Sequence, residues 1–332
     1  MKTRRRITAG PIPRLSKPTS EEAPGPAVEG SLVRRILCPI DFSEFSLAAA
    51  GEAVALARLW KAQLTTLFVF PPAAASGEDP SERLAPIPDT SVRSVVAKDM
   101  QDFLLPAGAA DLPVRHSFKA GDPARSILDE AAALPADLLV MGTHGRSGLE
   151  RWVLGSVTDR VLRQAPCPVL TVSRPAAGTP VSAPLTGILC AVDLTETSEM
   201  TLGYALALAQ KADVPLTVVH VVEGITEASA PVPYGVSQHG LHRETEARDC
   251  LRRAVPSAAG SRVEEVVVTG RPYREILRLA VERGTGLIVV GTHGPDPIDR
   301  MFFGSTADHV VRGAPCPVLT VRPSTRQTRG DV

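Results

Sequence analysis

LLVMGTHGRSGLERWVLGS, residues 138–156, decides how the chain folds, because it returns as LIVVGTHGPDPIDRMFFGS at residues 287–305. In each copy, four apolar residues run directly into a glycine-rich segment that closes on Gly-Ser. The apolar run predicts a strand buried on both faces, and the residues after Gly-Ser predict a helix. The glycines and the serine keep their spacing, whereas the residues between them change.

Other landmarks return in the same order, about 150 residues apart. ILCPID in the first copy corresponds to ILCAVD in the second, AGDPARSIL corresponds to TGRPYREIL, and APCPVLTV occurs in both. Collinear repetition over a whole domain length indicates two copies of one fold, in agreement with a length of 332 residues. We expect five parts: a disordered tail at 1–32, domains at 33–173 and 185–322, a Pro/Gly/Ser/Ala-rich linker at 174–184, and a C-terminal tail at 323–332.

Short Val/Ile/Leu-rich runs alternate with helical patterns in each copy, as where Ala50, Ala53, Val54 and Ala57 form one apolar stripe. The alternation predicts an α/β fold: two open, doubly wound parallel sheets with helices on both faces. Ligands of such sheets bind at the carboxyl ends of the strands, where the winding reverses. The expected strands lie near 34–40, 64–70, 113–118, 137–141 and 168–172, and near 187–192, 215–222, 263–268, 286–290 and 317–321.

Composition argues against several classes of protein. Lys plus Arg equals Asp plus Glu at 36 each, so no global field would attract nucleic acid or an anionic membrane. No apolar run approaches the ~20 residues that span a bilayer, and the N-terminus lacks a secretory signal pattern, so we expect a cytoplasmic protein. Four of the five cysteines match in pairs between the copies and none forms CxxC, which predicts reduced thiols rather than disulfides or zinc ligands.

The glycine-rich segment could bind phosphate. A loop that leaves a strand and returns at a helix N-terminus can surround an anion with backbone N–H groups, and glycines allow close approach. A plainer interpretation is also open: Ser156 followed by Asp159, like Ser305 followed by Asp308, fits a helix-capping pattern that needs no ligand. Neither GxxxxGK[ST] nor a GxGxxG fingerprint occurs, so the familiar nucleotide motifs are absent from the sequence.

The spacing G-x2-G-x9-G-[ST] resembles the ATP-binding motif of the universal stress proteins. The resemblance extends to an Asp ending the first strand, a Val ending the second, a G-x-P turn and a closing PVL-x-V strand, in both copies. The motif is met by Gly142, Gly145, Gly155 and Ser156, and again by Gly291, Gly294, Gly304 and Ser305.

The resemblance implies a Rossmann-like, five-stranded domain with strand order 3-2-1-4-5 in each half, and one ATP per half. It implies that Asp41 and Asp193 lie beside the ribose or an associated metal such as Mg²⁺, and that Val69 and Val221 meet adenine through their backbone. The glycines with Ser156 and Ser305 would hold the phosphates, and Val157 and Thr306 would add backbone donors.

Other interpretations of these residues stay open. Asp41 and Asp193 precede helices, where Asp is also a good N-cap. His144 and His293 could reach a phosphate or could be satisfied locally, and we interpret His239 and His242 as solvated. The resemblance also implies that the two halves pair through their last strands, as single-domain members dimerise; whether the whole chain forms a homodimer, and which protein partner it has, is left open.

Three functions follow: a nucleotide-binding regulatory or stress-response protein, a slow ATPase, or an interaction scaffold without nucleotide. No loop lysine or paired catalytic groups favour hydrolysis. The retained glycines favour nucleotide binding over a scaffold. Pro295, Asp296 and Pro297 stand where the first copy has Arg146, Ser147 and Gly148. Proline removes backbone donors and Asp adds negative charge, so we expect weaker binding in the second half.

Overall fold

The computed structural model describes residues 33–70, 89–145, 154–173, 185–223, 238–256, 262–292 and 303–322. The expected tails and linker lie outside these residues, as do the interiors of both glycine-rich loops, including Gly294, His293 and the Pro-Asp-Pro segment. The domain boundaries therefore stay a prediction.

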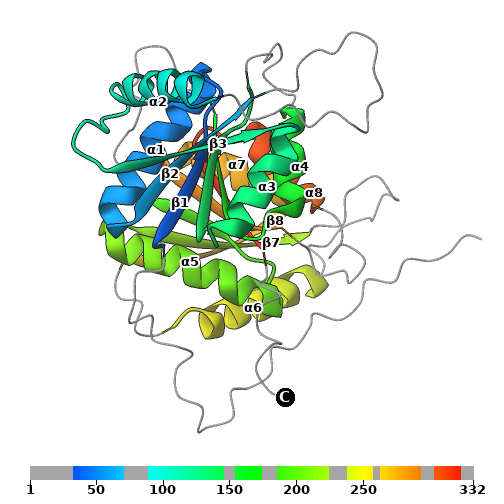
Figure 1. The fold of residues 1–332 in the computed structure, drawn as a ribbon. Coiled ribbons are helices and arrows are strands. Elements are labelled where there is room, and N and C mark those ends of the chain that lie inside the picture. Colours follow the sequence, from blue (N-terminus) through cyan, green and yellow to red (C-terminus); the bar gives the residue numbers. More distant parts are fainter. Residues whose placement is uncertain are drawn as a thin grey trace, which may run out of the picture.

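The first half alternates strands and helices in the predicted order (Figure 1). All five of its strands fall where the apolar runs placed them. Its elements are β1 (Arg35–Pro39), α1 (Glu44–Trp60), β2 (Gln63–Phe70), α2 (Thr90–Leu104), β3 (Val114–Ala120), α3 (Pro123–Ala133), β4 (Leu138–Gly142), α4 (Ser156–Gln164) and β5 (Val169–Val172).

The second half repeats this order of elements. Its five strands also match the predicted positions to within a few residues. They are β6 (Ile188–Ala191), α5 (Glu196–Ala212), β7 (Leu216–Glu223), α6 (Gln238–Ala254), β8 (Val263–Gly270), α7 (Pro272–Glu282), β9 (Leu287–Gly291), α8 (Ser305–Gly313) and β10 (Val318–Val321).

All ten strands belong to one continuous sheet with the order β3-β2-β1-β4-β5-β10-β9-β6-β7-β8. Each half is parallel internally and has the predicted order 3-2-1-4-5. The first-half strands and β7 and β8 point in clearly different directions in Figure 1, as expected for a sheet that accumulates twist from strand to strand.

The halves meet where β5 pairs antiparallel with β10, and Leu170 stands opposite Leu319. The threonines on either side reinforce this seam. Thr171 donates its hydroxyl to the Val318 carbonyl at 3.2 Å, and Thr320 donates to the Val169 carbonyl at 3.1 Å. The seam is therefore approximately two-fold symmetric, and the pairing through the last strands that the resemblance implied is present within the chain.

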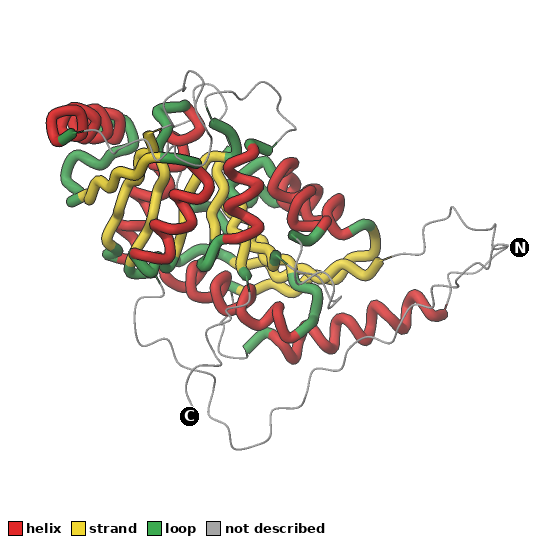
Figure 2. The backbone as a smooth tube through the Cα atoms, turned by 45° about the vertical axis from the view of Figure 1, so that its right-hand side comes forward, coloured by secondary structure: helices red, strands yellow, loops and turns green. Residues whose placement is uncertain are grey.

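Helices cover both faces of the sheet (Figure 2). One buried apolar cluster joins the sheet to α1, α2, α5 and α6, and a second joins the opposite face to α3, α4, α7 and α8. Each cluster contains residues of both halves, so the core passes through the seam on both sides of the sheet. Burial on both faces explains why the central strands are almost wholly apolar, whereas the edge strands β3 and β8 are more exposed and carry polar residues.

Two further sequence-based expectations can be compared with the fold. All five cysteines are free thiols, as expected. Four of them lie in strands or just before them, but Cys250 lies within α6, so a position in or near a strand is wrong for that residue. Among the described residues, no helix combines the length and the apolar character that crossing a bilayer requires.

Candidate functional site

The site begins with the aspartate that follows β1. Asp41 Oδ1 accepts a hydrogen bond from the Ser43 N–H at 3.0 Å, and Ser43 rather than Asp41 is the N-cap of α1. The interpretation of Asp41 as the cap is wrong, because the cap lies two residues further on and the helix begins at Glu44. Between them Phe42 has φ of 62°, a left-handed conformation that is unfavourable for a bulky side chain. This turn leaves the Asp41 carboxylate at the end of the strand.

The first glycines of the loop follow β4, the strand next to β1, and are tightly packed. A Cβ on Gly142 would lie 2.8 Å from the Cβ of Phe45 on α1. A Cβ on Gly145 would lie 2.7 Å from Oδ2 of Asp41. A side chain on Gly142 would collide with the Phe45 backbone, whereas a side chain on Gly145 would displace the Asp41 carboxylate. The structure thus brings Asp41 and Gly145, which are distant in the sequence, into direct proximity at the reversal point of the sheet.

The far end of the loop returns to the same place. The Gly155 N–H donates to the Thr143 carbonyl at 2.9 Å, and the Thr158 hydroxyl on α4 donates to the Gly142 carbonyl at 2.9 Å. These bonds anchor the start of α4 beside the end of β4. Sequence reasoning missed both threonines; the repeated GTHG motif was the available signal for Thr143, whereas nothing marked Thr158.

The N-terminus of α4 has no side-chain cap. Its N-cap is Gly155, and Ser156 is the first helical residue, so the capping interpretation of Ser156 is wrong. The physical reason is the bond to Thr143, which holds Gly155 in an extended conformation and starts the helix one residue earlier than the capping pattern suggests. Asp159 instead forms an ion pair with Arg163. The N–H groups of Ser156 and Val157 have no acceptor among the described residues.

The two valines lie where strand backbone becomes free. Pairing of β2 with β1 ends at Leu67, whose carbonyl accepts from the Ile40 N–H at 2.8 Å. Along a strand, every second residue directs its backbone N–H and C=O to the same side. Val69 lies two residues after Leu67, so its N–H and C=O point to the side on which β1 lies, but beyond the end of β1. Val221 has the same relation to Val219, which accepts from Val192 at 2.9 Å. Among the described residues, no partner is found for the backbone groups of either valine on that side.

The second half repeats this frame. Gly304 N–H donates to the Thr292 carbonyl at 2.8 Å, and Gly304, not Ser305, is the N-cap of α8. The capping interpretation of Ser305 is wrong for the same reason as in the first half. Gly291 ends β9, and Thr306 is the second residue of α8. Gly294 lies outside the described residues.

Asp193 is held differently from Asp41. Its Oδ1 accepts from the Thr195 N–H at 3.0 Å, from the Thr195 hydroxyl at 2.6 Å, and from the Ser198 hydroxyl. The N-cap of α5 is Thr195, so Asp193 is not the cap either. Ser46 occupies the position of Ser198 in the first half, but it donates its hydroxyl to the Ser43 carbonyl instead of to Asp41.

Aromatic residues further distinguish the halves. Phe42 lies 5.3 Å, between ring centroids, from both Phe68 and Phe103, and Phe68 lies 5.0 Å from Phe70. The residues in the equivalent positions to Phe42, Phe68 and Phe70 are Leu194, His220 and Val222. Burial lowers the pKa of His220, and its hydrogen bond to the Val192 carbonyl and the charge of Asp193 act in the opposite direction.

The loop histidine of the first half is partly satisfied nearby. Its Nδ1 lies 3.1 Å from the Thr143 hydroxyl, and its ring packs on Phe45 at 5.0 Å. His144 Nε2 is buried, and it has no hydrogen-bond partner among the described residues. His242 is exposed and pairs with Glu246, as expected for a solvated residue, whereas the side chain of His239 lies outside the described residues.

The described residues contain no group of three or more His, Cys, Asp or Glu side chains arranged to hold a metal by themselves. What the site offers is different. It combines backbone N–H groups at an uncapped helix N-terminus, a carboxylate and free strand backbone around a crowded glycine. Such a set of groups can bind an anion and a neighbouring polar ring system.

Comparison with known proteins identifies the family to which both halves are similar. The model of the universal stress protein family matches residues 33–173 and 186–322. A universal stress protein of Methanocaldococcus jannaschii is 36% identical over 152 residues, which cover 44% of this chain and 85% of that protein. A solved universal stress protein from Archaeoglobus fulgidus has 22% identity and a TM-score of 0.57, and covers 88% of this chain and 97% of its own.

A solved protein of unknown function from Pseudomonas aeruginosa has the same fold, with a TM-score of 0.60, 19% identity, and coverage of 88% of this chain and 93% of its own. At this identity, the solved structures support the fold alone. The family model, in contrast, matches both halves over most of their length. The chain therefore belongs to the universal stress protein family.

Proposed function

We propose that the chain is a cytoplasmic, ATP-binding stress-response regulator whose first half contains the stronger of two nucleotide sites. The observation that carries this proposal is the convergence of Asp41, Gly145 and the uncapped N-terminus of α4 at the carboxyl edge of the sheet. A phosphate group would satisfy the N–H groups of Ser156 and Val157, and the helix dipole favours its negative charge.

The remaining residues fit the same ligand. Gly142, Gly145 and Gly155 let the backbone approach the phosphates, and Asp41 is placed to accept from ribose hydroxyls or to bind Mg²⁺ that accompanies ATP. The free backbone of Val69 can pair with the adenine edge. In the second half Asp193, Val221, Gly291, Gly294, Gly304, Ser305 and Thr306 would take the same roles.

Calorimetric titration of the full-length protein with ATP and MgCl₂ tests this function. Gly145→Val should weaken binding in the first half at least a hundredfold, which is about 2.7 kcal/mol, because the new side chain displaces Asp41. Gly203→Ala is the matched control, since a Cβ there has nothing within 4 Å. Circular dichroism establishes that both variants fold.

Two results would contradict the proposal. An interaction scaffold would bind no ATP, in calorimetry or as copurified nucleotide in mass spectrometry. An efficient phosphoryl-transfer enzyme would turn ATP over faster than ~1 s⁻¹, whereas a binding protein without paired catalytic groups should not.

A further inference from the structure

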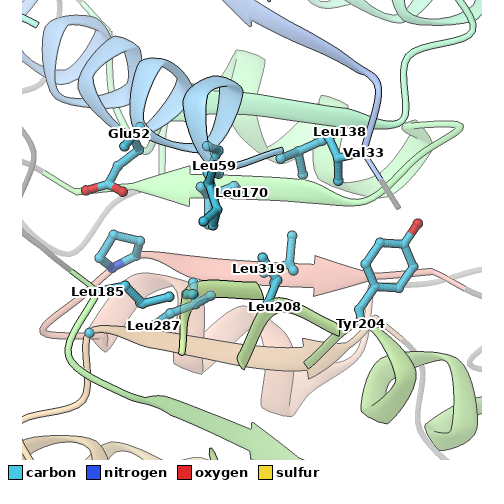
Figure 3. Close-up of a pocket in the computed structure, with 15 residues that line it drawn as sticks. Val33, Glu52, Leu59, Leu138, Leu170, Leu185, Tyr204, Leu208, Leu287 and Leu319 are labelled. Carbon is cyan, nitrogen blue, oxygen red and sulfur yellow. The ribbon is translucent and has the colours of Figure 1, made fainter. Parts of the chain in front are cut away.

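A cavity of about 490 Å³ lies on the seam between the two halves, away from both candidate nucleotide sites (Figure 3). It is lined by residues of the helices α1 and α5 and of the strands β4, β5, β9 and β10, and it is partly open to solvent. Its volume is in the range of small-molecule pockets, about 300–1,000 Å³. The cavity belongs to neither copy alone, because each supplies about half of its walls.

Most of the lining consists of equivalent apolar residues from the two copies. Val33 corresponds to Leu185, and Leu56 on α1 corresponds to Leu208 on α5. In the sheet, Leu138 and Leu170 correspond to Leu287 and Leu319. The pseudo-two-fold axis of the seam therefore runs through the cavity and makes its walls apolar from both sides.

One equivalent pair breaks this apolar symmetry. Glu52 immediately precedes Ala53 in α1, and Tyr204 immediately precedes the matching Ala205 in α5. Figure 3 shows these two side chains at opposite ends of the row of leucines. The cavity thus has a carboxylate at one end, a phenol at the other and hydrocarbon between them.

Glu52 lacks a compensating partner. No hydrogen bond or ion pair of its carboxyl is found within the described part of the chain, and no Lys or Arg is among the residues that line the cavity. Burial alone raises its pKa to about 7. A half-buried carboxylate without a counter-ion is costly, so a bound cation at this point would be stabilising.

We propose that this seam cavity binds a lipophilic amine, with the ammonium head on the Glu52 carboxylate and the apolar body along the leucines toward Tyr204. A carboxylic acid of the same shape would face Glu52 with like charge. A neutral apolar molecule would leave the carboxylate unpaired. A hydrated metal ion would gain nothing from the leucine walls. Both halves line the cavity, so an amine that binds there also stabilises the pairing of the two halves.

The test measures binding of n-decylamine, n-decanol and n-decanoic acid to the full-length protein by calorimetry, at neutral pH and below micelle-forming concentrations. We expect the amine to bind at least tenfold more tightly than the alcohol, and the acid to bind most weakly. Glu52→Gln should remove that advantage and leave alcohol binding unchanged. Glu199→Gln, an exposed glutamate on α5, is the matched control and should bind as the unmodified chain does.

A second variant tests the location. Leu56→Trp fills the cavity from the helix side and should abolish binding of both amine and alcohol, while circular dichroism reports whether the fold is kept. The proposal is overturned if n-decylamine does not bind, if Glu52→Gln binds it as tightly as the unmodified chain, or if folded Leu56→Trp still binds it. None of these measurements depends on ATP.

Discussion

The two halves share one backbone frame but surround its key aspartate differently. In both, a residue with φ near 60° follows the aspartate, and a Gly N–H returns to a threonine carbonyl before the helix. In the second half, Thr195 and Ser198 direct hydroxyls onto Asp193, whereas the equivalent Ser46 bonds to backbone. The two halves thus share the backbone conformation around the aspartate and differ in the polar side chains that bond to it.

The same lesson holds at the seam. The loop glycines of the first half are closely packed, and the strand leucines that line the seam are buried in both copies. Glu52 and Tyr204 occupy equivalent positions in α1 and α5, and they differ in charge. Differences between the halves are therefore the best guide to what each half does separately.

The largest effect that we expect from such a difference is a pH dependence of stability set by Glu52. Its pKa is about 7 in the folded chain, against 4.5 as the ordinary value. Between these values the folded state holds a proton that the unfolded state has lost, so the free energy of unfolding falls as pH rises through this window. We expect the free energy of unfolding to fall by about 2 kcal/mol across this window. This is less than the full pKa shift would give, because Glu52 is partly accessible to solvent.

Urea unfolding of the unmodified chain and of Glu52→Gln, from pH 5 to pH 8, measures this effect. The two proteins should be similarly stable near pH 5, and the variant should be the more stable near pH 8. Tyr204→Phe, the equivalent change in the second half, should leave this dependence in place, because burial raises the pKa of Tyr204 further from neutrality. Parallel pH profiles for the unmodified chain and Glu52→Gln would show that Glu52 is not responsible.

Exchanging loop residues should make the ATP affinity of the second nucleotide site more like that of the first. Replacing Pro295, Asp296 and Pro297 by Arg, Ser and Gly restores two backbone donors and removes a negative charge. We expect ATP affinity of the second half to rise about tenfold, or about 1.4 kcal/mol. Calorimetry in an Asp41→Asn background isolates that site, and an unchanged affinity there would assign the difference to the surroundings of Asp193 instead.

The smallest expected effect concerns the seam, where the halves should respond alike. Thr171→Val and Thr320→Val each remove one hydroxyl bond to a strand carbonyl across the β5–β10 pair. Each should lower the free energy of unfolding by about 0.5–1 kcal/mol, the usual net value of such a bond. If denaturation curves show that one variant loses several times more free energy of unfolding than the other, the seam is not symmetric.

Much of the fold could be predicted from sequence because it depends on local patterns. Buried strands need continuous apolar runs, and the collinear repeat predicted a second copy of each element. The start of α4 at Ser156 followed from the same repeat. The capping role of that serine did not hold, because the bond between Gly155 and Thr143 joins residues separated by a loop and leaves no local pattern.

Other features depend on three-dimensional proximity alone. The left-handed turn at Phe42 and Leu194 has no glycine to indicate it. The seam cavity exists only because β5 and β10 pair in one register, which brings Glu52 and Tyr204 to opposite ends of the same space. Sequence reasoning could align those two residues but could not show that they line one cavity.

The central claim is that two equivalent sites bind ATP unequally, and one matched pair of variants tests it most directly. Full-length Asp41→Asn and Asp193→Asn are titrated with ATP and MgCl₂ beside the unmodified chain. We predict a biphasic isotherm for the unmodified chain, loss of the tight phase in Asp41→Asn and loss of only the weak phase in Asp193→Asn. Identical isotherms for the two variants, or a single affinity with two equally filled sites, would contradict the account.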